Sequence, residues 1–503
     1  MISVIAPLDL ESQSPAFRHG AALLDLEGRK QLALRALGGE PIARLADGLD
    51  VSRKFVYRQA GKAGSAVEAA FQPPARDDDV LFRISVTKKW VEEVVLSALL
   101  HCHGSYRGVQ AFLRDTCDFE ISVGSIHNIV VAAIEGARRA NRQEDLCPIR
   151  VGAHDEIFQG DPVLVGVDPL STYCYLLAQE PGRDGTTWGV HLLDLSQRGL
   201  SLDYTVADAG KGLRAGQAEA WPGVPCRGDV FHAERGMGQM AAYLDNRAYG
   251  CIGTREKVER QMERAKNRGQ GQSFSKRLAL ARQEEATAVA LATDLGTLAQ
   301  WMREDVLSLT GPDAPTRHDL FRFIVAQMQA REHLAPHRIR PVRVALENQR
   351  DDLLAFAQDI DRQLAVAARE HQVPLRDVRE VFEMGRLAAV APDDYWQKDA
   401  ALWERLGPRY PAVRAAVDAV TQDTVRASSM VENLNSRLRC YFFLRREVGP
   451  AYLDLLRFFL NHRRYPRSRK EPRAGKSPAE ILHGRAFPHW LEQLGFTRFR
   501  RAA

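Results

Sequence analysis

The sequence predicts a mixed α/β core that is preceded by helical units and interrupted by a long all-helical segment. Three observations support this fold class. Short apolar, β-rich runs separated by Gly and Pro turns follow one another between residues 149 and 180, as in an antiparallel meander. No convincing strand occurs between about residues 233 and 425. Amphipathic helical patterns dominate that stretch and much of the first 145 residues.

The distribution of charge indicates a polyanionic partner. The 503 residues are enough for three or four domains, and their net charge is only +5. Residues 433–503, however, hold sixteen Lys and Arg against five Asp and Glu, a net charge of +11. A basic end on a nearly neutral chain favours binding to nucleic acid, and a merely solubilising tail is the alternative.

Targeting and membrane signals are missing from the sequence. It shows neither a signal peptide nor an apolar run long enough to span a bilayer. Its seven cysteines form no C-x-x-C pair, so neither a zinc ribbon nor a disulfide framework is indicated. We therefore expect a cytoplasmic, nucleoid-associated protein without a membrane partner.

The first helical unit is expected within residues 1–61. A turn at residues 48–52 separates an apolar-periodic helix from one that Ser52 can cap, which is the layout of a helix-turn-helix. Such a recognition helix would place four polar or basic residues against DNA: Ser52, Arg53, Lys54 and Arg58. A plain helical hairpin is the alternative, but this helix is polar and basic outside Phe55 and Val56.

A second helix-turn-helix is expected at residues 85–145, after a linker at residues 62–84 that contains paired prolines and an acidic run. Two helical segments precede a third helix, which is capped near Ser122 and runs to about Ala140. Ser125 and Asn128 would lie on its DNA-reading face. Two such units joined by a linker suit site-specific DNA binding.

The predicted core begins at residues 146–232. Three β-rich runs are followed by a helix near Thr187–Leu195 and by a strand at Tyr204–Val206. Three antiparallel strands, a helix and a further strand are the order of a ribonuclease-H-like fold. We expect the first strand to end on Asp155 and the later strand to end just before Asp208.

The remaining chain is predicted to be a helical insertion followed by the second part of the core. The insertion covers residues 233–425 and includes a nearly continuous helix over Lys257–Met302 with a break at Gly269–Gln272. Residues 426–484 return to the core with a helix at Ser428–Arg439, which carries Glu432 in its first turns. A basic tail at residues 485–503 is expected to follow.

Two stretches carry a specific family pattern. The run D-A-G-K-G-L begins at Asp208, and fifteen residues after it the pattern D-x-x-H spans Asp229 to His232. The pattern N-x-x-R followed by SPAE-x-L occurs in residues 461–482. These motifs resemble those of DDE transposases of the Mutator-like and hAT-like kind, which include many bacterial insertion-sequence transposases. The resemblance covers about residues 149–484. Within this range the insertion resembles that of the family in being all-helical, not in its sequence.

This resemblance implies a catalytic triad of acids with Asp208 as its second member. Phosphodiester transfer uses two divalent ions about 4 Å apart, and Mg²⁺ prefers carboxylates, water and substrate phosphate oxygens. The fold must therefore gather three carboxylates, two from adjacent strand ends and one from a helix. Asp155, Asp208 and Glu432 have those contexts and would hold two Mg²⁺ or Mn²⁺ ions.

Rival acids remain open at the first and third positions. The alternatives to Asp155 are Glu156, Asp161 and Asp168, and those to Glu432 are Asp423 and Glu447. The signature residues Asp229 and His232 are expected to orient the site or to contact DNA rather than to bind metal, and a structural role is an alternative. Basic residues near the end of the chain are expected to contact DNA phosphates: Arg437, Arg439, Arg463, Arg464, Arg467 and Lys470.

The function that the resemblance implies is transposition. Such an enzyme cuts double-stranded DNA at the ends of a mobile element and joins those ends to target DNA, usually as a homodimer or higher oligomer in a DNA synapse. A ribonuclease-H-like nuclease without strand transfer and a domesticated DNA-binding regulator are the alternatives. Three retained acids argue against the regulator, and two DNA-binding units argue against a simple nuclease.

Overall fold

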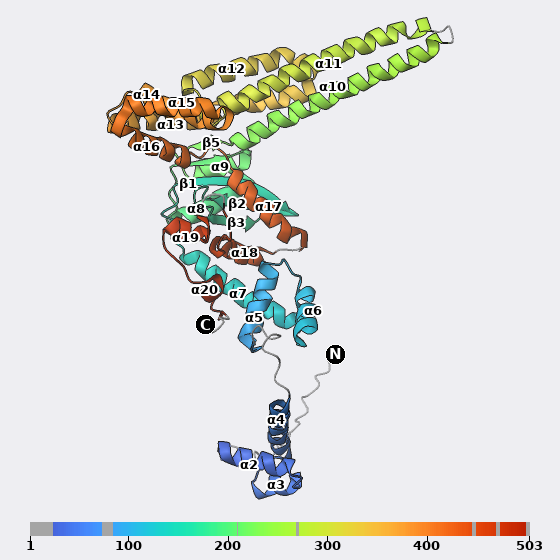
Figure 1. Ribbon diagram of the computed structural model, residues 1–503, viewed down its shortest axis with the longest axis vertical. Coiled ribbons are helices and arrows are strands. Elements are labelled where there is room, and N and C mark those ends of the chain that lie inside the picture. The colour runs from blue at the N-terminus through green and yellow to red at the C-terminus, as the bar shows by residue number, and fades with distance from the viewer. Residues whose placement is uncertain are drawn as a thin grey trace, which may run out of the picture. The chain divides into compact units, whose positions relative to one another are not determined.

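The structure, a computed structural model, describes residues 24–72, 84–208, 210–267, 271–444, 449–468 and 473–498. The chain divides into two compact units, Met1–Ser85 and Val86–Ala503. The described part of the first unit consists of three helices (Figure 1): α2 (Leu26–Leu37), α3 (Ile42–Gly48) and α4 (Arg53–Phe71). They enclose a small core that includes Leu32, Leu45 and Val56.

Helix α4 begins where the sequence predicts and ends later. The Ser52 hydroxyl accepts a hydrogen bond from the Phe55 amide, which caps the helix. The helix then continues to Phe71, so residues 62–71 are helical rather than part of the predicted linker. Alanines and other helix formers in this run outweigh Gly61 and Gly64, and the prolines at 73 and 74 come only after it.

The second unit contains one mixed five-stranded sheet (Figure 1): β1 (Val151–Gln159), β2 (Asp161–Val167), β3 (Cys174–Gln179), β4 (Tyr204–Ala207) and β5 (Cys226–Gly228). The strand order is β3-β2-β1-β4-β5. The first three strands pair antiparallel, whereas β4 lies parallel to β1 and β5 parallel to β4. The predicted meander and the later strand are confirmed, and β5 is an element that the sequence did not predict.

Helices cover both faces of the sheet. On one face α8 (Gly185–Gln197) and α9 (Lys211–Ala220) enclose a core that includes Trp188, Leu192 and Leu213. On the other face the core joins the strands to three further helices: α7 (Val123–Gln143), α17 (Ser429–Leu444) and α18 (Pro450–His462). The two separated parts of the predicted core therefore fold together around one sheet.

The predicted second helix-turn-helix shares this core. Helices α5 (Lys88–Leu100), α6 (Tyr106–Cys117) and α7 pack with the strands and α18 in one hydrophobic cluster. The predicted tail at 485–503 likewise begins within it, because Trp490 and Leu491 of α20 (Trp490–Gln493) are buried there. Residues 86–145 therefore belong to the same compact unit as the sheet, and the described part of the tail is mainly a packed element.

An all-helical stretch separates β5 from α17. Its helices are α10 (Val230–Lys266), α11 (Ser275–Trp301), α12 (Ala314–Arg331), α13 (Pro336–Glu370), α14 (Leu375–Val390), α15 (Pro392–Leu406) and α16 (Tyr410–Asp423). They share their own hydrophobic core, with Leu295, Phe321 and Ile360 among its buried residues. The predicted helical insertion is thus confirmed as helical, although its first helix begins at Val230 instead of near Lys257.

A short helix, α19 (Pro478–His483), lies between α18 and α20 and begins with a capping box between Ser477 and Glu480. Within the described residues, no helix has both the length and the apolar composition needed to cross a membrane. The structure is therefore mostly helical, with one small mixed sheet flanked by helices.

Candidate metal centre

Asp155 and Asp208 occupy equivalent positions on neighbouring parallel strands. Ala153 of β1 pairs with Val206 of β4, and each aspartate lies two residues beyond its member of that pair. Contrary to prediction, β1 does not end at Asp155, because its antiparallel pairing with β2 continues to Gln159. The two carboxylates meet because this parallel register places Asp208, which directly follows β4, beside Asp155.

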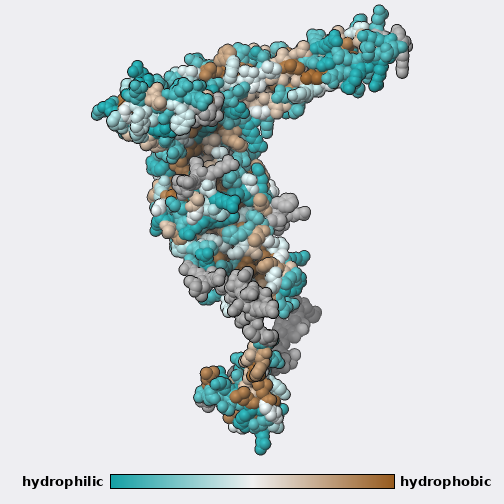
Figure 2. Space-filling model, viewed as in Figure 1, coloured by the Kyte–Doolittle hydropathy of each residue, from teal (hydrophilic) through white to brown (hydrophobic). Residues whose placement is uncertain are grey.

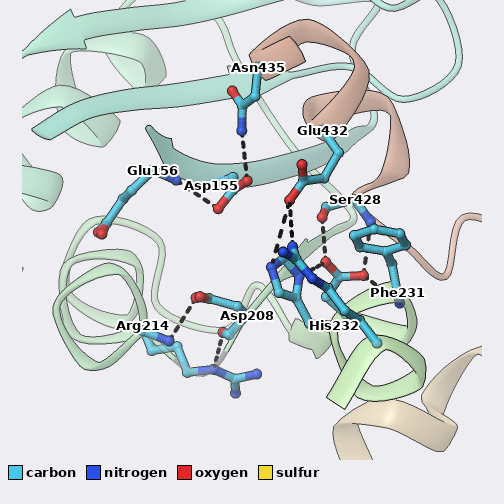
Figure 3. Close-up of polar contacts among 12 residues, drawn as sticks. Asp155, Glu156, Asp208, Arg214, Phe231, His232, Ser428, Glu432 and Asn435 are labelled. Carbon is cyan, nitrogen blue, oxygen red and sulfur yellow. Dashed lines mark hydrogen bonds and ion pairs between the residues drawn. The ribbon is translucent and has the colours of Figure 1, made fainter. Parts of the chain in front are cut away.

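Helix α17 lies on the face of the sheet toward which Asp155 points. The Asn435 amide donates a 2.8 Å hydrogen bond to Asp155 Oδ2, and the Glu156 backbone N–H donates one of 2.8 Å to Oδ1. Glu432 is one helical turn before Asn435, so the same contact brings its carboxylate toward the two aspartates (Figure 3). Asn435 is 2% exposed.

Among the described residues, Asp155, Asp208 and His232 form a group that could hold a metal ion. One potential ligand atom from each of them lies within 4.8 Å of the other two. Glu432 stands beside this group, with Oε1 4.0 Å from His232 Nε2 and 3.8 Å from Arg235. The structure therefore brings all three predicted acids into one neighbourhood, but His232 takes the third place in the tightest cluster. The Glu432 carboxylate is engaged by the positive side chain of Arg235 instead.

The donor set fits a hard divalent ion. Its carboxylates supply the oxygen ligands that Mg²⁺ and Mn²⁺ prefer. The buried amide oxygen of Asn435 has no hydrogen-bond partner among the described residues, and a buried polar atom of this kind is often satisfied by a water or an ion. A cavity of about 330 Å³ that is lined by Asp208 and His232 opens between α10 and α13.

Asp229 joins the two parts of the site. It caps α10, its side chain is completely buried, and one oxygen accepts hydrogen bonds from the backbone N–H groups of Phe231 and Ser428. The other oxygen is bonded to the Ser428 hydroxyl and to His232 Nδ1. A single carboxylate thus fixes the ring of His232 and the start of α17, which carries Glu432.

The pKa values follow from burial and from these contacts. Burial, reinforced by the charges of Asp208 and Glu432, raises the pKa of Asp155 to about 6. Burial alone would also raise the pKa of Asp229, but hydrogen bonds from His232 and Ser428 hold it below its ordinary value. The hydrogen bond to Asp229 raises the pKa of His232.

The rival acids lie in other surroundings. Glu156 accepts hydrogen bonds from Arg183 and the Trp188 indole, whereas Asp161 is exposed at the β1–β2 turn. Asp168 is 3% exposed and accepts hydrogen bonds from Ser171 in the β2–β3 turn. Among the rivals to Glu432, Asp423 ends α16, and Glu447 lies outside the described residues.

A basic pocket of about 470 Å³ lies along α17, the helix that also carries Glu432. It is lined by Met430, Asn433 and Arg437 of α17 and by residues that follow α18. Arg463, Arg467 and Arg473 also line it, and none of its four arginines forms an ion pair with a described carboxylate. Arg473, which the sequence analysis did not select, donates a hydrogen bond to the Leu170 carbonyl oxygen.

The other predicted DNA-binding residues have varied settings. Arg464 is bonded to Glu480 and to the Phe487 carbonyl oxygen, so it secures α19. Arg439 is exposed on α17, and Lys470 lies outside the described residues. Six residues of the two helical units are exposed or line a surface cavity: Ser52, Arg53, Lys54, Arg58, Ser125 and Asn128.

The raised pKa of Asp155 predicts a pH-dependent gain of stability in Asp155→Asn. Ionisation of Asp155 costs more in the folded state, so wild-type stability should fall as pH rises from about 4 to about 6. At pH 8 without metal, the variant should be more stable by on the order of 1–3 kcal/mol, and the difference should vanish below pH 4. Urea unfolding of the two proteins in the presence of a chelator measures the stability difference at each pH. A variant less stable than the wild type at pH 8 would contradict the prediction.

Comparison with known proteins adds no assignment: no protein-family model matches the chain, and no curated protein matches it significantly.

Proposed function

We propose that this protein is a DDE-type DNA transposase with a ribonuclease-H-like catalytic core. The observation that carries the proposal is the convergence of Asp155, Asp208 and Glu432 from three distant parts of the chain. Like charges repel, so gathering them in a half-buried site destabilises the metal-free protein. A bound cation would offset that free-energy cost. A purely structural role for the three acids would not explain why they are gathered.

The arrangement of the sheet supports the same proposal. Three antiparallel strands, then a helix and a further strand parallel to the first, are the sequence order on which the expectation of a ribonuclease-H-like core rests. The helical insertion lies between the second and third acids, as in the family that the motifs resemble. The basic pocket along α17 supplies a place for the phosphates of a bound strand.

Each group then has a chemical role. Asp155, Asp208 and Glu432 would hold two divalent ions, which when bound would activate the attacking hydroxyl and stabilise the leaving oxygen. His232, oriented through Nδ1 by Asp229, presents Nε2 to the same space, and in its protonated form, which the hydrogen bond to Asp229 favours, it can donate a hydrogen bond to a phosphate oxygen. The pocket arginines bind the neighbouring phosphates and position the strand.

The test mixes the purified protein with Mg²⁺, a target plasmid and a DNA duplex. The duplex carries one end of the proposed mobile element, taken from the DNA that flanks the gene. Strand cleavage at that end followed by joining to the plasmid is the expected result. Cleavage without joining would favour a nuclease, and specific binding without cleavage would favour a DNA-binding regulator.

We expect the basic pocket to contribute affinity rather than sequence specificity. Arg463→Gln together with Arg467→Gln should weaken binding to all duplexes about equally, and should reduce the slope of log K against log salt by about 2. A matched control, Arg322→Gln with Arg369→Gln, removes the same charge from exposed positions of the insertion. Fluorescence anisotropy over a salt series measures the slope, and a loss confined to one sequence would contradict phosphate contact.

A further inference from the structure

Helices α10 and α11 form an arm that extends from the candidate metal centre (Figure 1). The base of α10 contributes His232 to the centre, and the helix has 37 residues. At 1.5 Å per residue it spans roughly 55 Å. The end of this arm therefore lies about 50 Å from the carboxylates, roughly the length of 15 base pairs of duplex DNA.

Among the described residues, the outer part of the arm consists of α10, α11 and the short 3-10 helix Gly271–Phe274 that precedes α11. The hydrophobic core of the insertion includes Ala248 of α10 and Ala288 of α11. Beyond these positions, the buried apolar residues are Val258, Ala265, Leu278 and Ala281, none of which belongs to a larger cluster. Figure 2 shows mainly hydrophilic residues over this part of the arm. This described part of the arm therefore has a small buried core and a large exposed surface.

That surface is strongly basic. Residues 257–277 contain seven Lys and Arg against two Glu. Both glutamates are paired, Glu259 with Arg255 and Arg282 and Glu263 with Lys266. Five exposed cations pair with no described carboxylate: Lys257, Arg260, Arg264, Lys276 and Arg277.

Three of these cations form a stripe. Lys257, Arg260 and Arg264 follow the spacing i, i+3, i+7, which places them on one face of α10. Their mutual repulsion, which exposed Glu256 one turn before Arg260 offsets in part, favours an anion along the stripe. Phosphates of a DNA backbone repeat along a line and match such a row of cations better than a single small anion does.

We propose that the basic stripe on the outer α10–α11 arm binds the backbone of duplex DNA about 11 to 14 base pairs from the scissile phosphodiester. The inference rests on the proposed function, which supplies the DNA substrate. It adds a contact far from the metal centre, and that contact depends on the length of the duplex and not on its base sequence. The arm thereby sets a minimum length of duplex for full affinity, because a shorter duplex cannot reach the stripe.

The experiment combines one variant with two duplexes that extend 8 or 30 base pairs from the cleavage site on both sides. Lys257→Gln, Arg260→Gln and Arg264→Gln together preserve helix formers and remove three charges. For the long duplex the variant should bind about 10-fold more weakly, with a salt slope lower by about 2 to 3. For the short duplex it should match the wild type.

The control variant carries Arg322→Gln, Arg369→Gln and Lys398→Gln, which remove the same charge from exposed positions elsewhere in the insertion. It should bind both duplexes like the wild type. Equal salt slopes for the arm variant and the wild type on the long duplex would overturn the proposal, as would equal losses on both duplexes. If the wild type neither binds nor cleaves either duplex, the proposed function fails instead, and the two failures are thus distinguishable.

Discussion

Asp208→Asn should lower the rate of Mg²⁺-dependent DNA cleavage by at least about 10³-fold while leaving the fold intact. The substitution keeps the size of the side chain and an oxygen that can accept the Gly210 N–H, a bond of 2.8 Å. It removes one negative charge from the group that faces Asp155 and His232. Asp155→Asn and Glu432→Gln should have comparable effects, because each withdraws a carboxylate from the same site.

Melting temperatures with and without metal, together with cleavage rates, distinguish a variant that no longer binds the ion from one that no longer folds. Mg²⁺ or Mn²⁺ should raise the melting temperature of the wild type more than that of any of the three variants, because the ions bind only the folded site. Asp161→Asn provides the control, since it removes an equal charge from an exposed turn outside the cluster. Normal cleavage by all three site variants would refute the two-metal account.

Asp229→Ala should destabilise the protein by about 3–5 kcal/mol, the range for breaking a buried ion pair from one side. The substitution removes the acceptor of four hydrogen bonds and leaves the donors on Phe231, His232 and Ser428 without it. The start of α17 then loses its two hydrogen bonds from Ser428 to Asp229, so cleavage should be lost even in molecules that remain folded. Urea unfolding and cleavage rates measure the two effects.

The pH dependence of this destabilisation has a defined sign. The lowered pKa of Asp229 means that its contribution is present above its ordinary value of 3.8. The raised pKa of His232 means that its contribution is complete below its ordinary value of 6.5 and is lost as pH rises through the higher folded value. The destabilisation in chelator should therefore be largest between about pH 4 and 6.5 and smaller at pH 9.

Ser428→Ala is the matched milder change. It removes one hydroxyl from Asp229 but keeps the backbone N–H donor of residue 428, so a loss of about 1–2 kcal/mol is expected. If Asp229→Ala proved no more destabilising than Ser428→Ala, Asp229 would not be the attachment point that its contacts indicate.

Local sequence was sufficient where one stretch of chain determines its own structure. The meander could be predicted because its β-rich runs end in Gly and Pro turns, and the Ser52 cap because a single hydroxyl reaches an amide three residues later. The three acids could be selected from their local contexts and from the family motif. Their approach to one another depends on folding of the whole unit, and only the structure shows it.

Other features could not be predicted because they depend on distant partners. The three residues of β5 contain no β-rich run, and their strand conformation comes from pairing with β4. The end of β1 was placed too early because its polar residues resemble a turn, whereas pairing with β2 extends the strand. Arg235 and Asn435 carry no motif, and they contact the acids because α10 and α17 meet there.

The bond between Asp229 and Ser428 also determines when the site can form during synthesis. The two residues are 199 positions apart, and chains grow at about 5–20 residues per second. Roughly 10 to 40 seconds therefore pass between the appearance of Asp229 and that of its partner. A nascent or prematurely terminated chain that lacks α17 holds two aspartates without Glu432, so nuclease activity should first arise when translation is almost complete.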